Sequence, residues 1–271
     1  MTMKTIAWFV SGVFLAAVLL VSCEDYLDKT PDDDMTIDEV FTNPDWTRAW
    51  LYNCYSWLPN EANFADDGAF RSPFTGGCDE MEIAFGASYS HLINAGSWNA
   101  TNISRVPVWE QSYCALRAVN IFLANIDRVP NLSESDYDSM LGEAYFLRAF
   151  FHFLVFRAYG PIPIVKNVVS GSDDWSEMVR RPVDECVSEI VDDCNKAIEY
   201  LPVSRVETEY GRPPKVAAYA LKSRILLYAA SPLYNGNTDL DRLKDPVTGN
   251  SLISQTYDKE KWKLAADAAR D

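Results

Sequence analysis

Apolar residues recur with a helical period along most of the chain beyond residue 36, and the clearest example is the segment 182–201. One apolar stripe runs through this segment without a break and comprises Val183, Cys186, Val187, Ile190, Val191, Cys194, Ala197, Ile198 and Leu201. Pro182 fits the first turn of a helix, and the acidic Asp184 and Glu185 suit the positive end of a helix dipole. Pro202 closes the segment, so the pattern predicts an amphipathic helix with one buried face.

The segments 106–127 and 214–230 predict two further helices. The first has one apolar face, formed by Trp109, Tyr113, Leu116, Val119, Leu123 and Ile126, and it ends before Pro130. The second, PKVAAYALKSRILLYAA, is rich in alanine and is terminated by the dipeptide Ser231-Pro232.

The segment 135–159 predicts a helix at the centre of the fold. Ser133 or Ser135 can cap its start, and Gly160 followed by Pro161 stops it. Its second half, EAYFLRAFFHFLVFRAYG, is apolar on nearly all sides. A helix of that kind is buried all round, so we expect its neighbours to surround it.

These helices have the length and the short connections of tetratricopeptide-like hairpins. The expected pairs are 106–127 with 135–159, and 182–201 with 214–230. Gly142 and Ala144 are small enough to allow close approach of two helices, and strand signals are confined to short runs such as 162–169. The sequence therefore predicts an all-α fold, an α-α superhelix of hairpins with one long irregular loop.

Shorter helices are predicted near both ends of this helical region, which we place at 36–271. Thr36 and Glu39 form a capping box, and Asn43-Pro44 ends the helix that follows it. A second helix opens at Asp45 and is expected to pack through Trp46, Ala49, Trp50, Asn53, Cys54 and Trp57. Another helix starts near Lys259, and because the sequence ends inside it, we expect 36–271 to be the N-terminal part of a longer protein.

The stretch between Leu58 and Val106 shows no sustained period, although it is rich in aromatic and polar residues. Long irregular loops in compact domains are often functional. A sugar ring packs its C–H face on an aromatic ring, while carboxylates, amides and guanidinium groups bind its hydroxyls. The candidate ligand-binding residues are Trp98, Asn99, Asn102, Asp79 and Arg71. The alternative is that the aromatic residues only pin the loop to the helices and that Asp79 is a structural hydrogen-bonding residue.

The N-terminus has the pattern of a bacterial lipoprotein signal. Residues 1–22 carry one charge, Lys4, followed by an apolar run that ends at Leu20-Val21-Ser22-Cys23. This ending resembles a lipobox, which implies cleavage before Cys23 and attachment of a diacylglycerol to its thiol. The acidic residues 23–35 then form a lipidated tether. The alternative is an ordinary signal peptide with Cys23 kept for a disulfide.

The charge of the chain and its remaining cysteines exclude several classes of function. The net charge of −15 becomes −16 when Lys4 is removed, so the protein should repel nucleic acid and anionic headgroups. Five cysteines remain after Cys23, and those at 186 and 194 are too far apart on one helix to form a disulfide. His91 and His152 are isolated from each other and from every cysteine, so we expect neither a metal site nor a cofactor.

Four stretches resemble the SusD/RagB family of outer-membrane glycan-binding lipoproteins of Bacteroidetes. They are CEDYLDKTP after the lipobox, GEAYFLRAFFHFLVFRAYGPIPIV (142–165), GRPPKVAAYALKSRILLYAASPLYNG (211–236) and the final WKLAADAARD. The resemblance covers the mature chain and corresponds to the N-terminal part of a typical member. It implies tetratricopeptide-like units, exposure on the outer membrane, and a SusC-type TonB-dependent transporter as partner.

The resemblance also implies a non-enzymatic function. The starch-binding relative holds its glycan with an aromatic arc and with asparagine, aspartate and arginine residues, partly from the region that matches 59–105. Trp98 and a nearby asparagine fit this arrangement, but one tryptophan stands where starch binders have two, so the glycan is not named. The alternatives are a surface scaffold that binds protein or peptide, and a glycoside hydrolase using Asp66 with Asp67 or Asp79 with Glu80.

Overall fold

The structure is a computed structural model, and it describes residues 35–60, 76–79, 89–97, 99, 101 and 108–271. The chain divides into two compact units, Met1–Val40 and Phe41–Asp271. In the first unit, helix α3 (Ile37–Val40) follows the predicted capping box. The Thr36 N–H donates to the Glu39 carboxylate at 2.7 Å, and the Glu39 N–H donates to the Thr36 hydroxyl at 3.3 Å.

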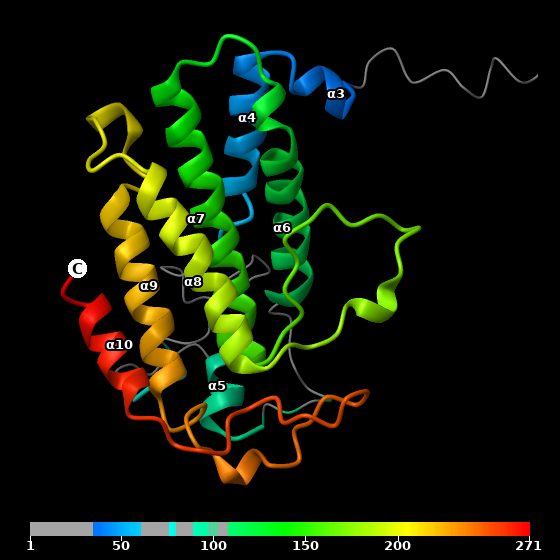
Figure 1. The fold of residues 1–271 in the computed structure, drawn as a ribbon, viewed down its shortest axis with the longest axis vertical. Helices are drawn as coiled ribbons and strands as arrows, with labels where there is room; N and C mark the ends of the chain where they lie inside the picture. The colour runs from blue at the N-terminus through cyan, green and yellow to red at the C-terminus, as the bar shows by residue number, and fades with distance from the viewer. Residues whose placement is uncertain (1–34, 61–75, 80–88, 98, 100, 102–107) are drawn as a thin grey trace, which may run out of the picture. The chain divides into compact units, whose positions relative to one another are not determined.

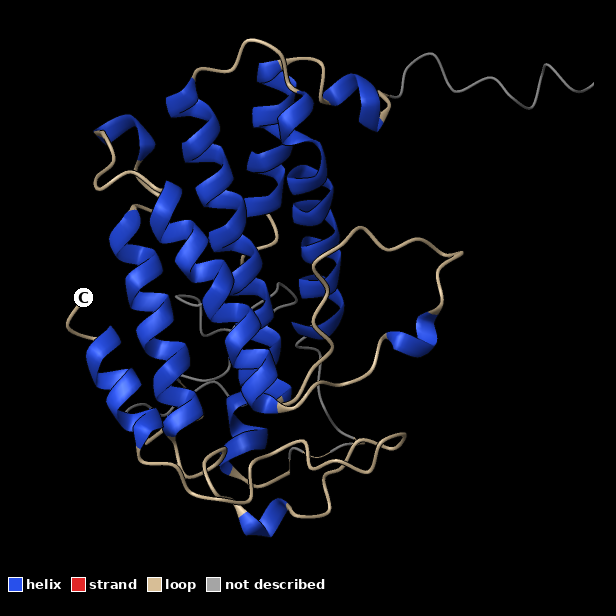
Figure 2. Ribbon diagram, in the orientation of Figure 1, coloured by secondary structure: helices blue, strands red, loops and turns tan. Residues whose placement is uncertain are grey.

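In the described residues of the second unit the regular secondary structure is helical, with isolated β-bridges but no named strand, and loops connect the helices. Its α-helices are α4 (Pro44–Tyr55), α5 (Tyr89–Asn94), α6 (Val108–Asn125), α7 (Glu134–Tyr159), α8 (Val183–Tyr200), α9 (Lys215–Ala230) and α10 (Glu260–Ala268). The 3₁₀ turns are η1 (Ile126–Arg128), η2 (Trp175–Glu177), η3 (Glu207–Glu209) and η4 (Thr238–Leu240). The predicted all-α class is confirmed (Figure 2).

The long helices pack in chain order, which is the tetratricopeptide-like arrangement. Helix α6 packs against α7, α7 against α8, α8 against α9 and α9 against α10. The pairs α6–α7 and α8–α9 are the two predicted hairpins, and α7 also contacts α4 and α9 (Figure 1). The predicted central position of α7 is therefore confirmed.

Local signals at the helix ends explain why the elements begin and end where they do. Asn43 caps α4 by accepting from the Asp45 N–H at 2.8 Å, so the Asn43-Pro44 pair that ends one helix also starts the next. Ser133 caps α7 through the Asp136 N–H at 3.0 Å. Gly160, with φ of 70°, ends α7 in a conformation that glycine adopts without strain.

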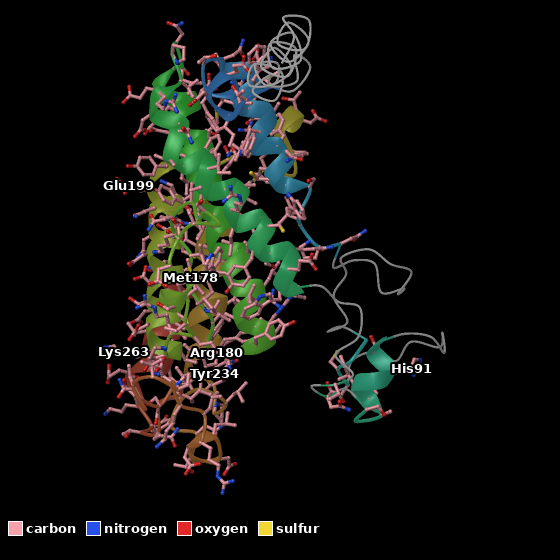
Figure 3. All side chains as sticks on the ribbon, turned by 90° about the vertical axis from the view of Figure 1, so that its right-hand side faces the viewer. His91, Met178, Arg180, Glu199, Tyr234 and Lys263 are labelled. Carbon is pink, nitrogen blue, oxygen red and sulfur yellow. The ribbon has the colours of Figure 1, made fainter. Side chains whose placement is uncertain are left out.

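The hydrophobic core lies among α7, α8 and α9, and its largest members include Phe151, Phe153 and Phe156 of α7. Gly142 of α7 lies against the end of α8, where an added Cβ would come within 2.8 Å of the Leu201 nitrogen. The predicted close approach at this glycine is therefore confirmed. Exposed residues such as Glu199 and Lys263 point outward, as Figure 3 shows.

Two details of the prediction were wrong. Helix α4 buries Thr47, Leu51 and Cys54, whereas Trp46 is exposed, because the true apolar face lies one position further along the helix. The stretch read as irregular contains helix α5, which is only six residues long and therefore too short to show a period. The helix predicted to start near Lys259 is confirmed as α10, which buries Ala265 and Ala268 and packs on α9.

The cysteines of the described residues carry free thiols, and three of them, Cys54, Cys186 and Cys194, are buried as predicted. Cys78 and Cys114 are exposed instead. Within the described parts of the chain, no helix is both long enough and apolar enough to cross a membrane. Cys23, the predicted lipidation site, lies outside the described residues.

Candidate functional site

The predicted sugar-binding residues fall only partly within the described chain. Trp98, Asn102 and Arg71 lie outside it, whereas Asn99 and Asp79 are described and exposed. The Asn99 carboxamide oxygen accepts from the Thr101 N–H at 3.0 Å and from the Thr101 hydroxyl at 2.7 Å. Asn99 therefore shapes a local turn, and the site built around Trp98 stays a prediction.

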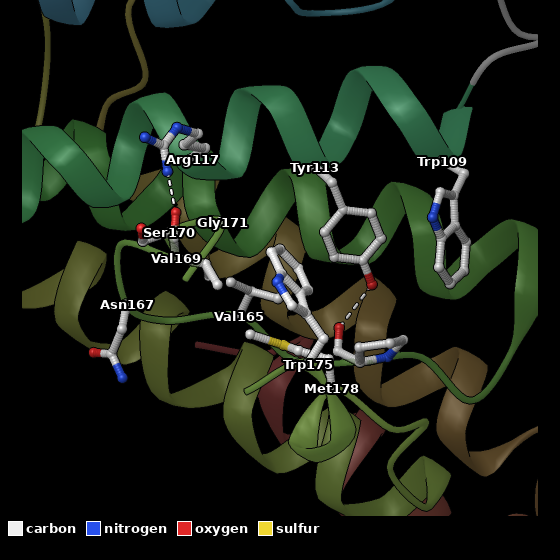
Figure 4. A pocket seen from close by; sticks show the side chains of 11 residues that line it. Trp109, Tyr113, Arg117, Val165, Asn167, Val169, Ser170, Gly171, Trp175 and Met178 are labelled. Atoms are coloured by element: carbon white, nitrogen blue, oxygen red, sulfur yellow. Dashed lines mark hydrogen bonds between the residues drawn. The ribbon is translucent and has the colours of Figure 1, made fainter. Parts of the chain in front are cut away.

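A groove of about 430 Å³ lies between α6 and the segment that connects α7 to α8 (Figure 4). We call it the aromatic groove. It is lined by Trp109, Tyr113, Arg117, Pro163, Val165, Asn167, Val169, Ser170, Gly171, Trp175 and Met178. Its volume lies within the range of small-molecule sites in proteins, roughly 300–1,000 Å³.

Aromatic side chains form both walls of the groove. Trp109 and Tyr113 are one turn apart on α6, with ring centroids 5.0 Å apart, and Trp109 also meets the ring of Tyr159 edge-on at 5.2 Å. Trp175 faces them from η2 and is 56% exposed, while Trp109 is 38% exposed. Both indole rings are therefore accessible to a ligand.

The segment 162–181, which we call the groove loop, is closed at its neck. The Arg181 N–H donates to the Ile162 carbonyl at 3.0 Å. The Arg180 guanidinium donates to the carbonyls of Pro161 at 2.7 Å and Tyr159 at 2.9 Å, so it joins the end of the loop to the end of α7. Figure 1 shows the loop extending from the neck between α7 and α8, carrying η2.

Polar side chains from the helices hold the wall of the groove. The Tyr113 hydroxyl donates to the Pro163 carbonyl at 2.7 Å, and Arg117 donates to the Val169 carbonyl. Burial raises the pKa of Tyr113, so its hydroxyl stays protonated and able to donate. The buried Asn120 amide donates to the carbonyls of Val165 at 3.0 Å and Asn167 at 3.1 Å.

A buried ionic cluster lies beneath this wall. We call it the Arg148 cluster, and it comprises Arg148, Asp193, Asn120 and His152. Arg148 binds the Asp193 carboxylate through two nitrogens, at 2.8 and 2.7 Å. It also donates to the Asn120 carboxamide oxygen and to the Lys166 carbonyl, each at 3.2 Å. Because both charges are buried and paired, the guanidinium is fixed in position and supports the groove loop.

His152 of this cluster acts as a neutral bridge between α7 and the groove loop. Its Nε2 accepts from the Val165 N–H at 3.1 Å, so its Nδ1–H donates to the Arg148 carbonyl at 3.0 Å. Burial is the main cause that lowers the pKa of His152 to about 4. These two hydrogen bonds give His152 a structural role in the core.

Sequence reasoning missed the aromatic groove. Trp109 was assigned to the buried stripe of its helix, although the structure leaves it partly exposed. Trp175 stands in the polar run SGSDDWSEM, much as Trp98 stands between Gly96-Ser97 and Asn99. A tryptophan surrounded by serine, glycine and aspartate could therefore have been found from the sequence.

The described lining of the groove offers aromatic faces, aliphatic groups, uncharged polar groups and one guanidinium. Its lining contains no carboxylate and no histidine, so within the described residues the groove holds no pair of groups for acid–base hydrolysis. Nowhere in the described chain do His, Cys, Asp and Glu side chains gather in a group that could hold a metal ion. Of the residues nominated for a hydrolase, Asp66, Asp67 and Glu80 lie outside the described chain.

Comparison with known proteins gives a consistent match. The family model SusD-like_3, described as starch-binding and associating with the outer membrane, matches residues 25–227. The SusD-like protein P38 of Formosa agariphila is 27% identical over 254 residues, which are 93% of this chain and 47% of that protein.

Solved structures agree with this match. The structure of BT4246 aligns with a TM-score of 0.67 at 29% identity, covering 88% of this chain and 39% of that one. A SusD-like protein from Bacteroides fragilis aligns with a TM-score of 0.58 at 25% identity, covering 84% and 47%. The chain spans less than half the length of each of these relatives. The model match covers most of the chain, and the chain therefore belongs to the SusD-like family of glycan-binding proteins.

Proposed function

We propose that this protein is a non-enzymatic cell-surface lipoprotein that binds oligosaccharides and delivers them to a SusC-type TonB-dependent transporter. The observation that carries the proposal is the family match over residues 25–227, because the family is described as starch-binding and associated with the outer membrane. The lipobox at Cys23 supports attachment by lipid, and an acidic surface fits an anchor that does not depend on basic residues.

The proposed glycan site is the predicted loop site, in which Trp98 stacks on a sugar ring and Asn99, Asn102, Asp79 and Arg71 bind its hydroxyls. The exposed position of Asn99 and Asp79 is compatible with this role, since both side chains can reach a ligand in solvent.

Affinity electrophoresis in gels containing polysaccharide tests this function. The mature chain with Cys23→Ser is expected to be retarded by at least one glycan, and Trp98→Ala should remove most of the retardation. Trp46→Ala, which removes an exposed tryptophan on α4, is the matched control and should leave retardation unchanged. Retardation that survives Trp98→Ala places the site elsewhere, whereas release of reducing ends from the glycan would identify a hydrolase.

Two experiments test the anchor and the transporter. Mass spectrometry of the membrane-extracted protein should find an acylated Cys23 at the N-terminus, and Cys23→Ala should release the protein from the membrane. Detergent extraction followed by affinity purification should recover a TonB-dependent transporter. Binding of peptides but of no glycan would favour the scaffold function.

A further inference from the structure

The aromatic groove lies outside the residues predicted to bind sugar, and its chemistry indicates a ligand of its own. Its two tryptophans come from different elements, Trp109 from α6 and Trp175 from η2, and Figure 4 shows them on either side of Tyr113. An exposed indole on a surface loop leaves apolar area in water, and such area gathered in one groove marks a binding site.

The polar groups of the groove suit a ligand that carries hydroxyls. Arg117 stands at one end, and Ser170 and Asn167 belong to the same lining. Among the residues whose side chains the structure describes, no acidic side chain lines the groove. The positive charge of Arg117 in the described lining disfavours a cationic ligand. Indole faces with nearby hydroxyl, amide and guanidinium groups match the apolar face and the hydroxyl edge of a pyranose.

The groove is preformed, because the groove loop, which forms one of its walls, is held in place by hydrogen bonds. Some of these come from buried side chains beneath the loop, and others come from the neck of the loop. Asn120 and His152 hold the backbone of Val165 from beneath. Arg180 and the Arg181 N–H close the neck, so the segment that carries Trp175 is anchored at its base. A ligand that binds a preformed site orders few protein side chains. The entropic cost of binding is therefore smaller.

We propose that the aromatic groove is a second saccharide site, in which Trp175 and Trp109 stack on pyranose rings of a bound oligosaccharide and Arg117 and Ser170 contact its hydroxyls. The class of ligand rests on the proposed function, because the glycan chemistry comes from the family. The location of the site is independent of that function and of Trp98.

Trp175→Ala is the direct test, since this side chain is exposed on the groove loop. The mature chain with Cys23→Ser is first applied to an array of plant, algal and host oligosaccharides. The strongest oligosaccharide on the array is then titrated by calorimetry. Trp175→Ala should weaken its binding about tenfold or more, as expected on removal of a stacking aromatic anchor. Trp175→Phe should retain most of the affinity.

Trp262→Ala is the matched control, because Trp262 of α10 is 40% exposed and lies outside the groove. It should leave both the array pattern and the titration unchanged, and thermal unfolding should show that all three variants are folded. Unchanged binding in Trp175→Ala overturns the second site, whether or not Trp98→Ala abolishes binding. Loss of binding in Trp98→Ala alone leaves the proposed function standing, whereas an array without any signal for the intact protein overturns both.

Discussion

Helix α7 carries two buried clusters of charged side chains, and the two clusters connect α7 to different segments of the chain. The first, which we call the Glu143 cluster, comprises Glu143, Arg205, Arg212, Tyr55 and Ser139 and joins α4 and the segment before α9 to α7. The Arg148 cluster lies further along the same helix and joins α6, α8 and the groove loop to α7. Both bury ions inside the bundle, but only the second touches a wall of the aromatic groove.

The comparison shows that two buried charge clusters on one helix can have different roles. The position of a cluster along α7 decides whether it contributes to stability only or also to the shape of the groove. Glu143 is 0% exposed and accepts from Arg205 at 3.0 Å and from the Tyr55 hydroxyl at 2.6 Å, contacts that are remote from the groove lining. Asn120 and His152 instead hold the Val165 backbone, which is part of that lining. Disturbing the first cluster should therefore cost stability alone, and disturbing the second should change the groove as well.

The largest effect is expected from Glu143→Ala. It removes the buried carboxylate that Arg205 and Arg212 share and leaves them paired with the part-exposed Glu209, and breaking a buried ion pair destabilises by about 3–5 kcal/mol. Urea unfolding monitored by circular dichroism measures the change. Glu260→Ala is the control, because its pair with Lys263 is exposed on both sides and should contribute within about 0.5 kcal/mol. A decrease of less than about 1 kcal/mol in the free energy of unfolding of Glu143→Ala would contradict this prediction. It would show that water solvates the two arginines in the variant.

The second effect is a pH dependence that belongs to the Arg148 cluster. The pKa of His152 is about 4 in the folded protein, against about 6.5 in the unfolded chain. Between these values the unfolded state takes up a proton and the folded state does not, so stability falls as the pH is lowered from about 6.5 to about 4. At 1.36 kcal/mol per pKa unit the loss amounts to about 3 kcal/mol.

His152→Gln isolates this effect, since carboxylates common to both proteins cancel in the difference. The stability advantage of the wild type over the variant should shrink by about 3 kcal/mol across that pH range. The groups around the ring are Asp193, Arg148 and Lys166, of which Asp193 favours its protonation and the two cations oppose it. A difference that stays constant with pH would mean that folding does not lower the pKa of His152.

A smaller and more local effect is expected from Asn120→Leu. The amide is 2% exposed, and its loss leaves two carbonyls of the groove loop and one donor of Arg148 unsatisfied, at a cost of about 1–3 kcal/mol. Hydrogen exchange should quicken in 163–169, and glycan binding in the groove should weaken. In Glu143→Ala, by contrast, the ratio of the amide exchange rates in 163–169 to those in α8 should be the same as in the wild type. Equal exchange changes in both variants would remove the distinction between the two clusters.

The sequence predicted the helices well because period and caps are local properties. The start of α7 follows from the Ser133 cap, and its end follows from Gly160. The unbroken apolar stripe of α8 allows only one face of the helix to be buried. The helix spans Val183–Tyr200, within the predicted 182–201. The face of α4 was predicted wrongly because its tryptophans, which weigh most in an apolar pattern, lie partly in solvent while the small Thr47 is buried.

The candidate site was harder to predict, because its geometry depends on contacts between residues far apart in the chain. The groove wall near Val165 is held by Asn120 and His152, and nothing in the local sequence of 162–169 shows these partners. The burial of Arg148 and Asp193 was not indicated by the sequence either, since a charged residue in a helical pattern is normally assigned to the face exposed to solvent. Polar residues inside an apolar helix such as 143–158 are the feature that sequence reasoning should have weighed.

The smallest effect tests the contact beside the Glu143 cluster, where α7 approaches the end of α8. Alanine normally stabilises a helix over glycine by about 1 kcal/mol. At Gly142, however, the new Cβ would lie 2.8 Å from the Leu201 nitrogen and 2.9 Å from its Cγ, so backbone must move and Gly142→Ala should destabilise by about 1–2 kcal/mol. Gly171→Ala meets no atom within 4 Å and should change the free energy of unfolding by less than about 0.5 kcal/mol. A stabilised Gly142→Ala, measured in the same urea series, would show that α8 can shift without disturbing Glu143, and the two clusters would then be joined less rigidly than their shared helix implies.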